Sequence, residues 1–161
     1  MPRVEAQLSW CLKQEERGHP GLRRMKPDSA ESQRHVEKAL HNLKAFDHNK
    51  AGFPDWAVSA AFYAMYHALL ALLAQNGYES RNQECTLAAV EHLIATGSIS
   101  LDARHLALVR QTGRMMPSDA KSLREQFQYG TAVSVDSALL DELQQNAIGL
   151  VEAVQLCLEG V

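Results

Sequence analysis

The chain has 161 residues, 46% of them hydrophobic, and carries a formal net charge of −3 at pH 7. This length suits one domain with a sizeable core and is too short for two, and the small negative charge excludes a protein that binds polyanions by bulk attraction. The charge is uneven, because residues 1–26 carry six Lys or Arg against three acids, whereas residues 131–161 carry five acids and no base. Such segments are either solvated faces or places where a nucleic acid or an acidic partner docks.

Helical periodicity dominates the sequence, with Gly and Pro at the boundaries, and strand-like alternation is nearly absent. We therefore predict an all-α fold, an up-and-down helical bundle of about five main helices. It is expected to form a single domain over residues 1–161, with an N-terminal helix and loop at 1–27 and a core bundle at 28–160. The stretch RGHPGLRRMKPDS is expected to be a loop, because it holds two Pro and two Gly. The expected helices, in chain order, cover residues 4–16, 29–46, 54–75, 82–96, 101–112, 118–128 and 136–158.

Apolar positions in two of these helices recur at helical spacing and predict the faces that the helices bury. In the second helix these positions are Val36, Ala39, Leu40 and Leu43. In the last helix they are Leu139, Leu143, Ala147, Leu150 and Val154.

The helix expected over residues 54–75 has no charged side chain from Trp56 to Ala74, and that run is long enough to cross a bilayer. It is rich in Ala, it holds polar side chains near its middle, and no basic cluster flanks it, all of which argue against a membrane. A helix that is apolar on every side in a soluble chain is one that its neighbours bury. Alanines at helical spacing form a smooth strip that another helix can approach closely, and bulky residues fill another face. The alanines are Ala57, Ala61, Ala64, Ala68 and Ala71, and the bulky residues are Phe62, Met65, Leu69, Leu72 and Leu73.

The three cysteines, Cys11, Cys85 and Cys157, lie far apart and are odd in number. Without a CxxC motif or a paired Cys/His spacing they do not predict zinc, and we expect free thiols in a protein of the reducing cytoplasm. The N-terminus does not resemble a signal peptide, because acids stand on both sides of its short apolar run. Asp102 and His105 have the spacing of metal ligands in helical bundles, but one pair does not make a site. With no nucleotide-binding or hydrolase motif either, we expect no metal and no cofactor.

Two places in the chain are candidates for function. His67 lies on the apolar third helix, one turn after Tyr63, and is either a core histidine with satisfied ring nitrogens or a histidine that lines a cleft, where burial shifts its pKa. The other candidate is SLREQFQYG, in which Arg124 and Tyr129 converge only if the helix ends between them, as Gly130 allows. An arginine offers a rigid fork for a phosphate, although a surface ion pair and a packed tyrosine would explain the same two residues.

Four segments of the chain, in their order and at their distances, carry a family resemblance. The first is AESQRHVEKALHNLKAFDHNKAGFPDWA, a helix and a short loop. The second is AVSAAFYAMYHALLALLAQNGYES, in which small residues lead to Y-A-M-Y-H-A, an apolar run and a Gly-Tyr turn. The third is AAVEHLIATGSISLDARHLALVRQ, and the fourth runs from LREQFQYG to CLEG, with an R-x-x-x-x-Y stretch before the closing helix. Over residues 29–160 the chain thereby resembles HEPN-domain proteins.

The resemblance implies an up-and-down helical bundle, commonly a homodimer. Many HEPN proteins bind or act on RNA, and several are toxins that a small nucleotidyltransferase antitoxin accompanies. The ribonucleases among them carry Arg-x(4–6)-His in the second half of the domain, and the Arg and His of two protomers meet in a dimer cleft. Their chemistry needs no metal, because the 2′-OH attacks the adjacent phosphate while a His helps to move the proton and an Arg stabilises the developing charge.

This chain departs from that motif, because Tyr129 stands where the His would follow Arg124, and a tyrosine with a pKa of about 10 is a poor base at neutral pH. The formal match Arg34-x6-His41 lies in the second helix, away from the family's motif, and we interpret it as a coincidence. We therefore predict a homodimeric, cytoplasmic module that binds RNA or a nucleotide, or engages a nucleotidyltransferase in a toxin–antitoxin system. The alternative is a metal-independent ribonuclease with an altered Arg-x4-Tyr motif. The predicted catalytic residues of the alternative are Arg124, Tyr129 and His67, and the predicted ligand-binding residues are Tyr63, Arg114 and Arg124.

Overall fold

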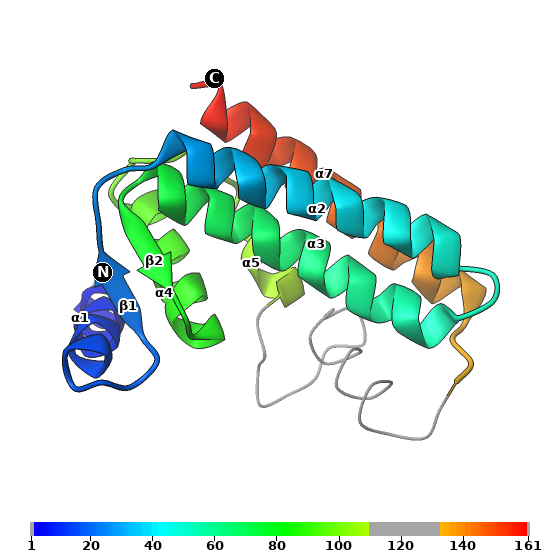
Figure 1. The fold of residues 1–161 in the computed structure, drawn as a ribbon, viewed down its shortest axis with the longest axis horizontal. Helices are drawn as coiled ribbons and strands as arrows, with labels where there is room; N and C mark the ends of the chain where they lie inside the picture. Colours follow the sequence, from blue (N-terminus) through cyan, green and yellow to red (C-terminus); the bar gives the residue numbers. More distant parts are fainter. Residues whose placement is uncertain (1, 110–132, 161) are drawn as a thin grey trace.

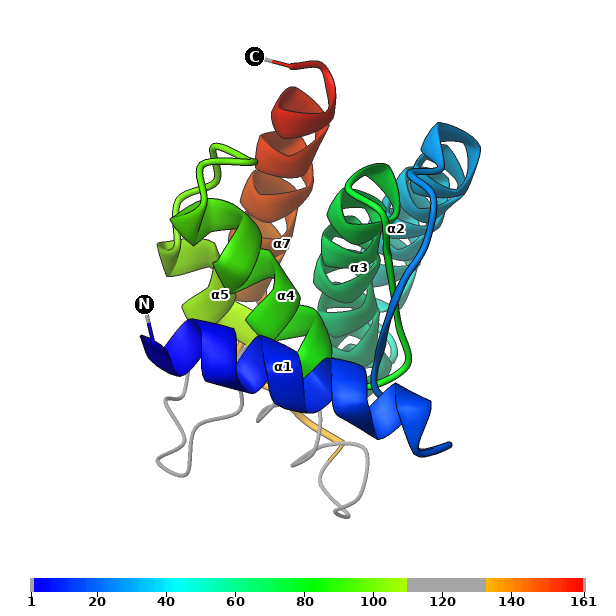
Figure 2. The same cartoon turned by 90° about the vertical axis from the view of Figure 1, so that its left-hand side faces the viewer.

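The computed structural model describes residues 2–109 and 133–160, which fold into a helical bundle (Figure 1). The described helices are α1 (Pro2–Glu16), α2 (Ser29–Asn49), α3 (Pro54–Gln75), α4 (Gln83–Ala95), α5 (Arg104–Val109) and α7 (Ser137–Leu158). α2, α3 and α7 run side by side along the long axis of the molecule. α1 lies across one end of the bundle, against α4 (Figure 2). The predicted all-α bundle is therefore confirmed.

α3 is the central helix of the bundle, and α2, α4, α5, α7 and a short strand all pack against it. Every alanine of the predicted strip and all five predicted bulky residues are buried, which confirms both faces. α3 is long and apolar enough to cross a membrane by length and composition alone, but 78% of its apolar window is buried inside the fold. The apolar character of α3 therefore fits a core helix that its neighbours cover.

The ends of α2 and α3 follow local features of the sequence. Asp28 caps α2, where its Oδ1 accepts a hydrogen bond of 2.9 Å from the Glu31 amide. Pro54 opens α3, and Gly77 follows its last turn with a φ of +83°. A Cβ at Gly77 would lie 2.8 Å from the carbonyl oxygen of Met25. Both the backbone conformation and this close approach therefore require glycine.

A two-stranded antiparallel sheet joins the N-terminal segment to the core. β1 (Leu22–Arg24) pairs with β2 (Tyr78–Ser80), with Arg23 opposite Glu79. β1 lies within the stretch expected to be a loop, and three residues are too few for an alternation of apolar and polar side chains to be recognised. The prediction of a loop is therefore wrong at β1.

The end of α2 and the start of α5 each differ from the prediction by three residues. α2 continues to Asn49 instead of ending at Phe46, because Phe46 is itself buried and holds the last turn against the core. α5 begins at Arg104 instead of Leu101. The reason is that Asp102 Oδ1 accepts a hydrogen bond of 2.9 Å from the Arg104 amide and caps the helix at that point.

The buried faces also differ in detail from the prediction. Leu40 is 37% exposed, because it lies on the edge of the buried stripe of α2, and Leu43 is only partly buried. In α7, Leu140 is fully buried, whereas Leu139 packs partly against the core. The rest of the predicted stripe of α7 is buried as expected. The helix predicted over residues 118–128 lies outside the described residues.

The expectation of free thiols is wrong for two of the three cysteines. A disulfide joins Cys11 of α1 to Cys85 at the start of α4, across a sequence separation of 74 residues and with the two Cα atoms 5.6 Å apart. Both residues are fully buried, and Cys157 is free. The sequence could not reveal the pairing, because cysteine spacing does not show which helices meet. Disulfides are rare in reducing compartments, so the cysteines no longer support the cytoplasmic location, which stays a prediction.

The disulfide should contribute strongly to the attachment of α1, because Leu8 and Cys11 are the buried residues among the described side chains of that helix. In the chain-entropy description, a cross-link that closes a loop of this length stabilises the folded state by about 4 kcal/mol. We expect reduction by dithiothreitol to lower the free energy of unfolding by about this amount, measured by urea denaturation.

The matched control is Cys157→Ala, which removes the free thiol and should show the same loss on reduction as the wild type. Cys11→Ser should be as unstable without reductant as the wild type is with it. Identical urea midpoints for the oxidised and the reduced wild type would contradict a stabilising disulfide.

Candidate functional site

α3 turns one narrow face to solvent, and aromatic side chains line that face. Trp56, Tyr63 and His67 follow the spacing i, i+7, i+11, which places them on one side of the helix. Trp56 is 57% exposed and Tyr63 is 40% exposed, and Phe53, just before the helix, is 61% exposed. His67 is half-buried. These four residues form what we call the aromatic stripe, and such an exposed line on an otherwise buried helix is a candidate binding surface.

Of the predicted site residues, the structure places Tyr63 and His67, and it brings both onto the aromatic stripe. Arg114, Arg124 and Tyr129 lie outside the described residues. The convergence of Arg124 and Tyr129 therefore stays a prediction.

At His67 the stripe meets a second histidine, His35 of α2. The Nδ1 atoms of the two rings lie 3.1 Å apart, and the rings stack with their centroids 5.3 Å apart. Sequence reasoning missed His35. Its distance from the turn of the helix hairpin is the feature that would have pointed to it. Residue 51, in the turn between α2 and α3, is midway between 35 and 67, and residues equally far from such a turn face each other. Ser32 and Ala71 lie within one residue of the same register, and Ser32 Oγ donates a hydrogen bond of 2.9 Å to the Ala71 carbonyl.

Both histidines are neutral at pH 7. Burial lowers the pKa of His67 to about 4. The positive charges of Lys38 and of His35, when that ring is protonated, lower the pKa of His67 further. Burial also lowers the pKa of His35, an effect that Glu31 opposes and Arg34 reinforces. Glu31 Oε1 lies 3.5 Å from His35 Nε2, which favours a proton on that nitrogen and leaves His35 Nδ1 to accept from the Nδ1–H of His67. The pair thus shares one hydrogen bond and carries no charge.

Tyr66, one residue before His67, has a structural role instead. Its hydroxyl lies 3.1 Å from Thr86 Oγ1 on α4, which in turn lies 2.7 Å from Ser80 Oγ. Burial raises the pKa of Tyr66, and the hydrogen bond with Thr86 opposes that rise. Tyr66 therefore joins α3 to α4, whereas Tyr63 is 40% exposed on the aromatic stripe.

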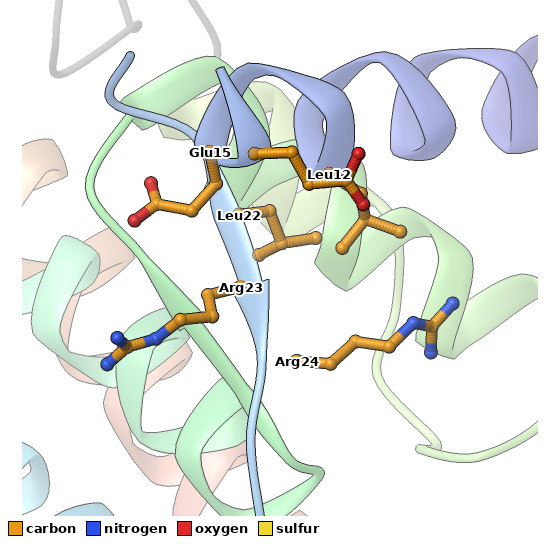
Figure 3. Close-up of a pocket in the computed structure, with 6 residues that line it drawn as sticks. Leu12, Glu15, Leu22, Arg23 and Arg24 are labelled. Carbon is orange, nitrogen blue, oxygen red and sulfur yellow. The ribbon is translucent and has the colours of Figure 1, made fainter. Parts of the chain in front are cut away.

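A pocket of about 480 Å³ opens between α1 and β1, with Leu22 among its lining residues (Figure 3). Arg23 and Arg24 also line this pocket, but their side chains extend to opposite sides of β1. Arg23 forms an ion pair of 2.8 Å with Glu79, and Arg24 donates a hydrogen bond of 3.0 Å to the Tyr78 hydroxyl. The two guanidinium groups do not converge on one anion, so this pocket is a poorer candidate than the stripe.

A second cavity, of about 360 Å³, lies between α5 and α7, and His105 and Asn146 are among its lining residues. His105 Nδ1 is buried and has no hydrogen-bond partner, and burial lowers the pKa of this histidine. Asp102, its predicted companion, caps α5 instead of facing a metal. Within residues 2–109 and 133–160, no three His, Cys, Asp or Glu side chains group closely enough to hold a metal ion.

Comparison with protein families bears directly on this fold. The family model described as the HEPN domain matches residues 32–159, which is most of the chain. The chain belongs to the HEPN family. This confirms the family resemblance seen in the sequence and supports a role related to nucleotides or RNA in general. No curated protein matches the chain.

In this HEPN chain the formal match Arg34-x6-His41 runs along α2. Arg34 donates through Nε to Glu31 Oε2 at 2.6 Å, and both Arg34 and His41 are exposed. The Arg34 side chain thus pairs with a residue one turn earlier on α2, and not with His41.

The lowered pKa values predict that acid destabilises the fold. In the unfolded chain His35 and His67 take up protons near their ordinary pKa, whereas in the folded protein His67 resists protonation until the pH approaches about 4 and the pKa of His35 is also lowered. The free energy of unfolding should therefore be constant above pH 6.5 and fall between pH 6.5 and about 4. Urea denaturation at a series of pH values measures this fall.

His67→Gln should reduce the loss of unfolding free energy between pH 6.5 and about 4, because the glutamine side chain does not titrate. His41→Gln, which removes an exposed histidine of α2, should leave it as in the wild type. An unchanged pH profile for His67→Gln would contradict the prediction.

Proposed function

We propose that this HEPN chain binds single-stranded RNA along the aromatic stripe of α3. The observation that carries the proposal is the exposure of Trp56 and Tyr63, two turns apart on a helix whose other faces are buried. An exposed aromatic ring offers a flat surface for a nucleobase, and each stacked base contributes about 1–3 kcal/mol. Proteins read RNA mainly where its bases are unpaired and able to stack, so a single strand or a free nucleotide suits this surface.

Positive charge beside the stripe supports the same proposal. Lys38 is exposed on α2, and it lies close enough to His67 for its charge to lower the pKa of that imidazole. An ammonium group next to a stacking surface suits a backbone phosphate. His67 carries its proton on Nδ1, so its Nε2 is an acceptor that suits a ribose 2′-hydroxyl.

Three further parts of the proposal rest on the sequence and the family resemblance alone. Arg114, Arg124 and Tyr129 stay predicted ligand-binding or catalytic residues. A homodimer stays the expected assembly, and a nucleotidyltransferase stays the expected partner in a toxin–antitoxin pair. Binding of RNA along the aromatic stripe requires none of these.

Trp56→Ala and Tyr63→Ala should each weaken the binding of a labelled mixed-sequence RNA. The loss of one stacked base predicts a decrease in affinity of about 5- to 150-fold, the equivalent of about 1–3 kcal/mol. Fluorescence anisotropy with EDTA present measures the affinity, and circular dichroism shows that each variant keeps its helices.

Trp10→Ala is the matched control, because Trp10 is an equally large exposed residue on α1 and its loss should leave the affinity unchanged. Lys38→Ala should reduce the slope of log K against log salt concentration by about 0.7. An equal loss in Trp10→Ala and Trp56→Ala would contradict the stripe as the site. RNA binding that does not respond to salt would contradict contacts with backbone phosphates, and the absence of RNA binding would point to a protein partner instead.

The alternative function is a metal-independent ribonuclease, and the neutral state of His67 favours it. A neutral imidazole is able to take the proton of a 2′-hydroxyl. A pKa of about 4, however, makes His67 a weak base at neutral pH. Binding without cleavage is therefore the better-supported function.

Wild type, Arg124→Ala and His67→Gln, incubated side by side with the labelled RNA in EDTA, distinguish the two functions. We expect the wild type to retain the RNA without cleaving it, and Arg124→Ala to retain less, because a phosphate contact is lost. Cleavage by the wild type that both variants lose would establish the ribonuclease. If Arg124→Ala melts at a much lower temperature than the wild type, Arg124 is structural and its place in the site is wrong.

A further inference from the structure

We propose that His35 and His67 bind one divalent first-row transition-metal ion per chain, through their two Nδ1 atoms. The ion belongs to the class that imidazole suits, such as Zn²⁺, Ni²⁺ or Cu²⁺. This metal site goes beyond RNA binding. It does not depend on RNA, because both metal ligands belong to the α2–α3 hairpin of the protein itself.

The separation of the two nitrogens matches the spacing of neighbouring ligands on a metal. Imidazole nitrogens lie about 2.0–2.1 Å from Zn²⁺, so two of them at octahedral or tetrahedral angles are about 2.8–3.4 Å apart. His35 Nδ1 and His67 Nδ1 are 3.1 Å apart. An ion bound by both atoms would lie off the line that joins them, so both rings must turn out of their hydrogen bond to direct their lone pairs at it.

The protonation state of the pair also suits a metal. Neutral imidazole is the form that binds metals, and both rings are neutral at pH 7. His35 Nδ1 already carries no proton, because Glu31 Oε1 faces Nε2 of the same ring at 3.5 Å, and its lone pair becomes available once the hydrogen bond from His67 is released. His67 needs only to exchange its proton from Nδ1 to Nε2 through solvent, so no net proton is released. A carboxylate behind the non-ligating nitrogen is the usual outer partner of a metal-binding histidine.

The two helices hold the rings in place. Ser32 Oγ binds the Ala71 carbonyl at 2.9 Å about one turn away from the pair, and Val36, beside His35, is buried in the core. Ligands on packed helices keep their positions more precisely than ligands on loops. The site therefore does not need to be assembled by the ion.

The surroundings of His35 leave room for water. A cavity of about 280 Å³ reaches His35 and is lined by Asp28, Glu31 and Glu79 among others. Glu79 is paired with Arg23 and Glu31 with Arg34, so among the described residues Asp28 is the carboxylate of this lining without such an ion pair, and it offsets the exposed Lys38. The described residues offer no third ligand in the pair's vicinity, so water fills the remaining coordination positions.

Titration of chelator-treated protein with Ni²⁺ or Zn²⁺ at pH 7.5, followed by calorimetry without RNA, tests the proposal. We expect one ion per wild-type chain. His35→Gln and His67→Gln should each weaken binding by more than about 10-fold, and Glu31→Gln, which keeps both ligands, by about 10-fold. With Cu²⁺, electron paramagnetic resonance should show two imidazole nitrogens in the wild type and at most one in His67→Gln.

His41→Gln is the matched control, because His41 is an exposed histidine of the same helix, and its affinity should stay within about twofold of the wild type. Wild-type affinity in His67→Gln, or an equal loss in His41→Gln, would overturn the proposal. Circular dichroism of the metal-free variants confirms that a loss of binding is not a loss of fold. Because the RNA assays contain EDTA, failure of this site and failure of the proposed function are separate results.

Discussion

The burial of α3 is the constraint on which the rest of this structure depends. A helix that is apolar almost all round must be covered on nearly every side, and α2, α4, α5 and α7 do this. One narrow face is left, and it carries Trp56, Tyr63 and His67. The candidate binding surface is thus part of the element that holds the core together. The backbone positions that carry its side chains are fixed, because α3 is packed on its other sides.

The sequence predicts most of this fold where local features are strong. α3 was predicted at its observed bounds, because Pro54 begins it and Asn76-Gly77 follow it. Features that depend on distant residues were missed. β1 and β2 are too short to show a pattern, and the partner of Cys11 lies 74 residues away. A single sequence shows spacing along the chain, whereas these contacts depend on how the helices pack.

The candidate site was predictable in part for the same reason. His67 and Tyr63 stand out as polar groups in an apolar run, but Trp56 and Phe53 resemble core residues until their exposure is known. His35 looks like one polar residue among many on α2. Its importance comes from the hairpin register, which sets it 3.1 Å from His67. Membership of the HEPN family supports a role related to nucleotides or RNA in general, and the contacts between α2 and α3 show which side chains of this particular chain lie together.

The disulfide between Cys11 and Cys85 has a consequence for how the protein would respond to a protease. α1 and β1 precede the region that matches the HEPN family, and the connection between α1 and α2 is the ordinary place for a cut in an exposed loop. With the disulfide intact, such a cut would release nothing, because Cys11 keeps α1 covalently attached to α4. The two pieces would migrate as one molecule until a reductant is added, so a nicked form would be visible only on a reducing gel.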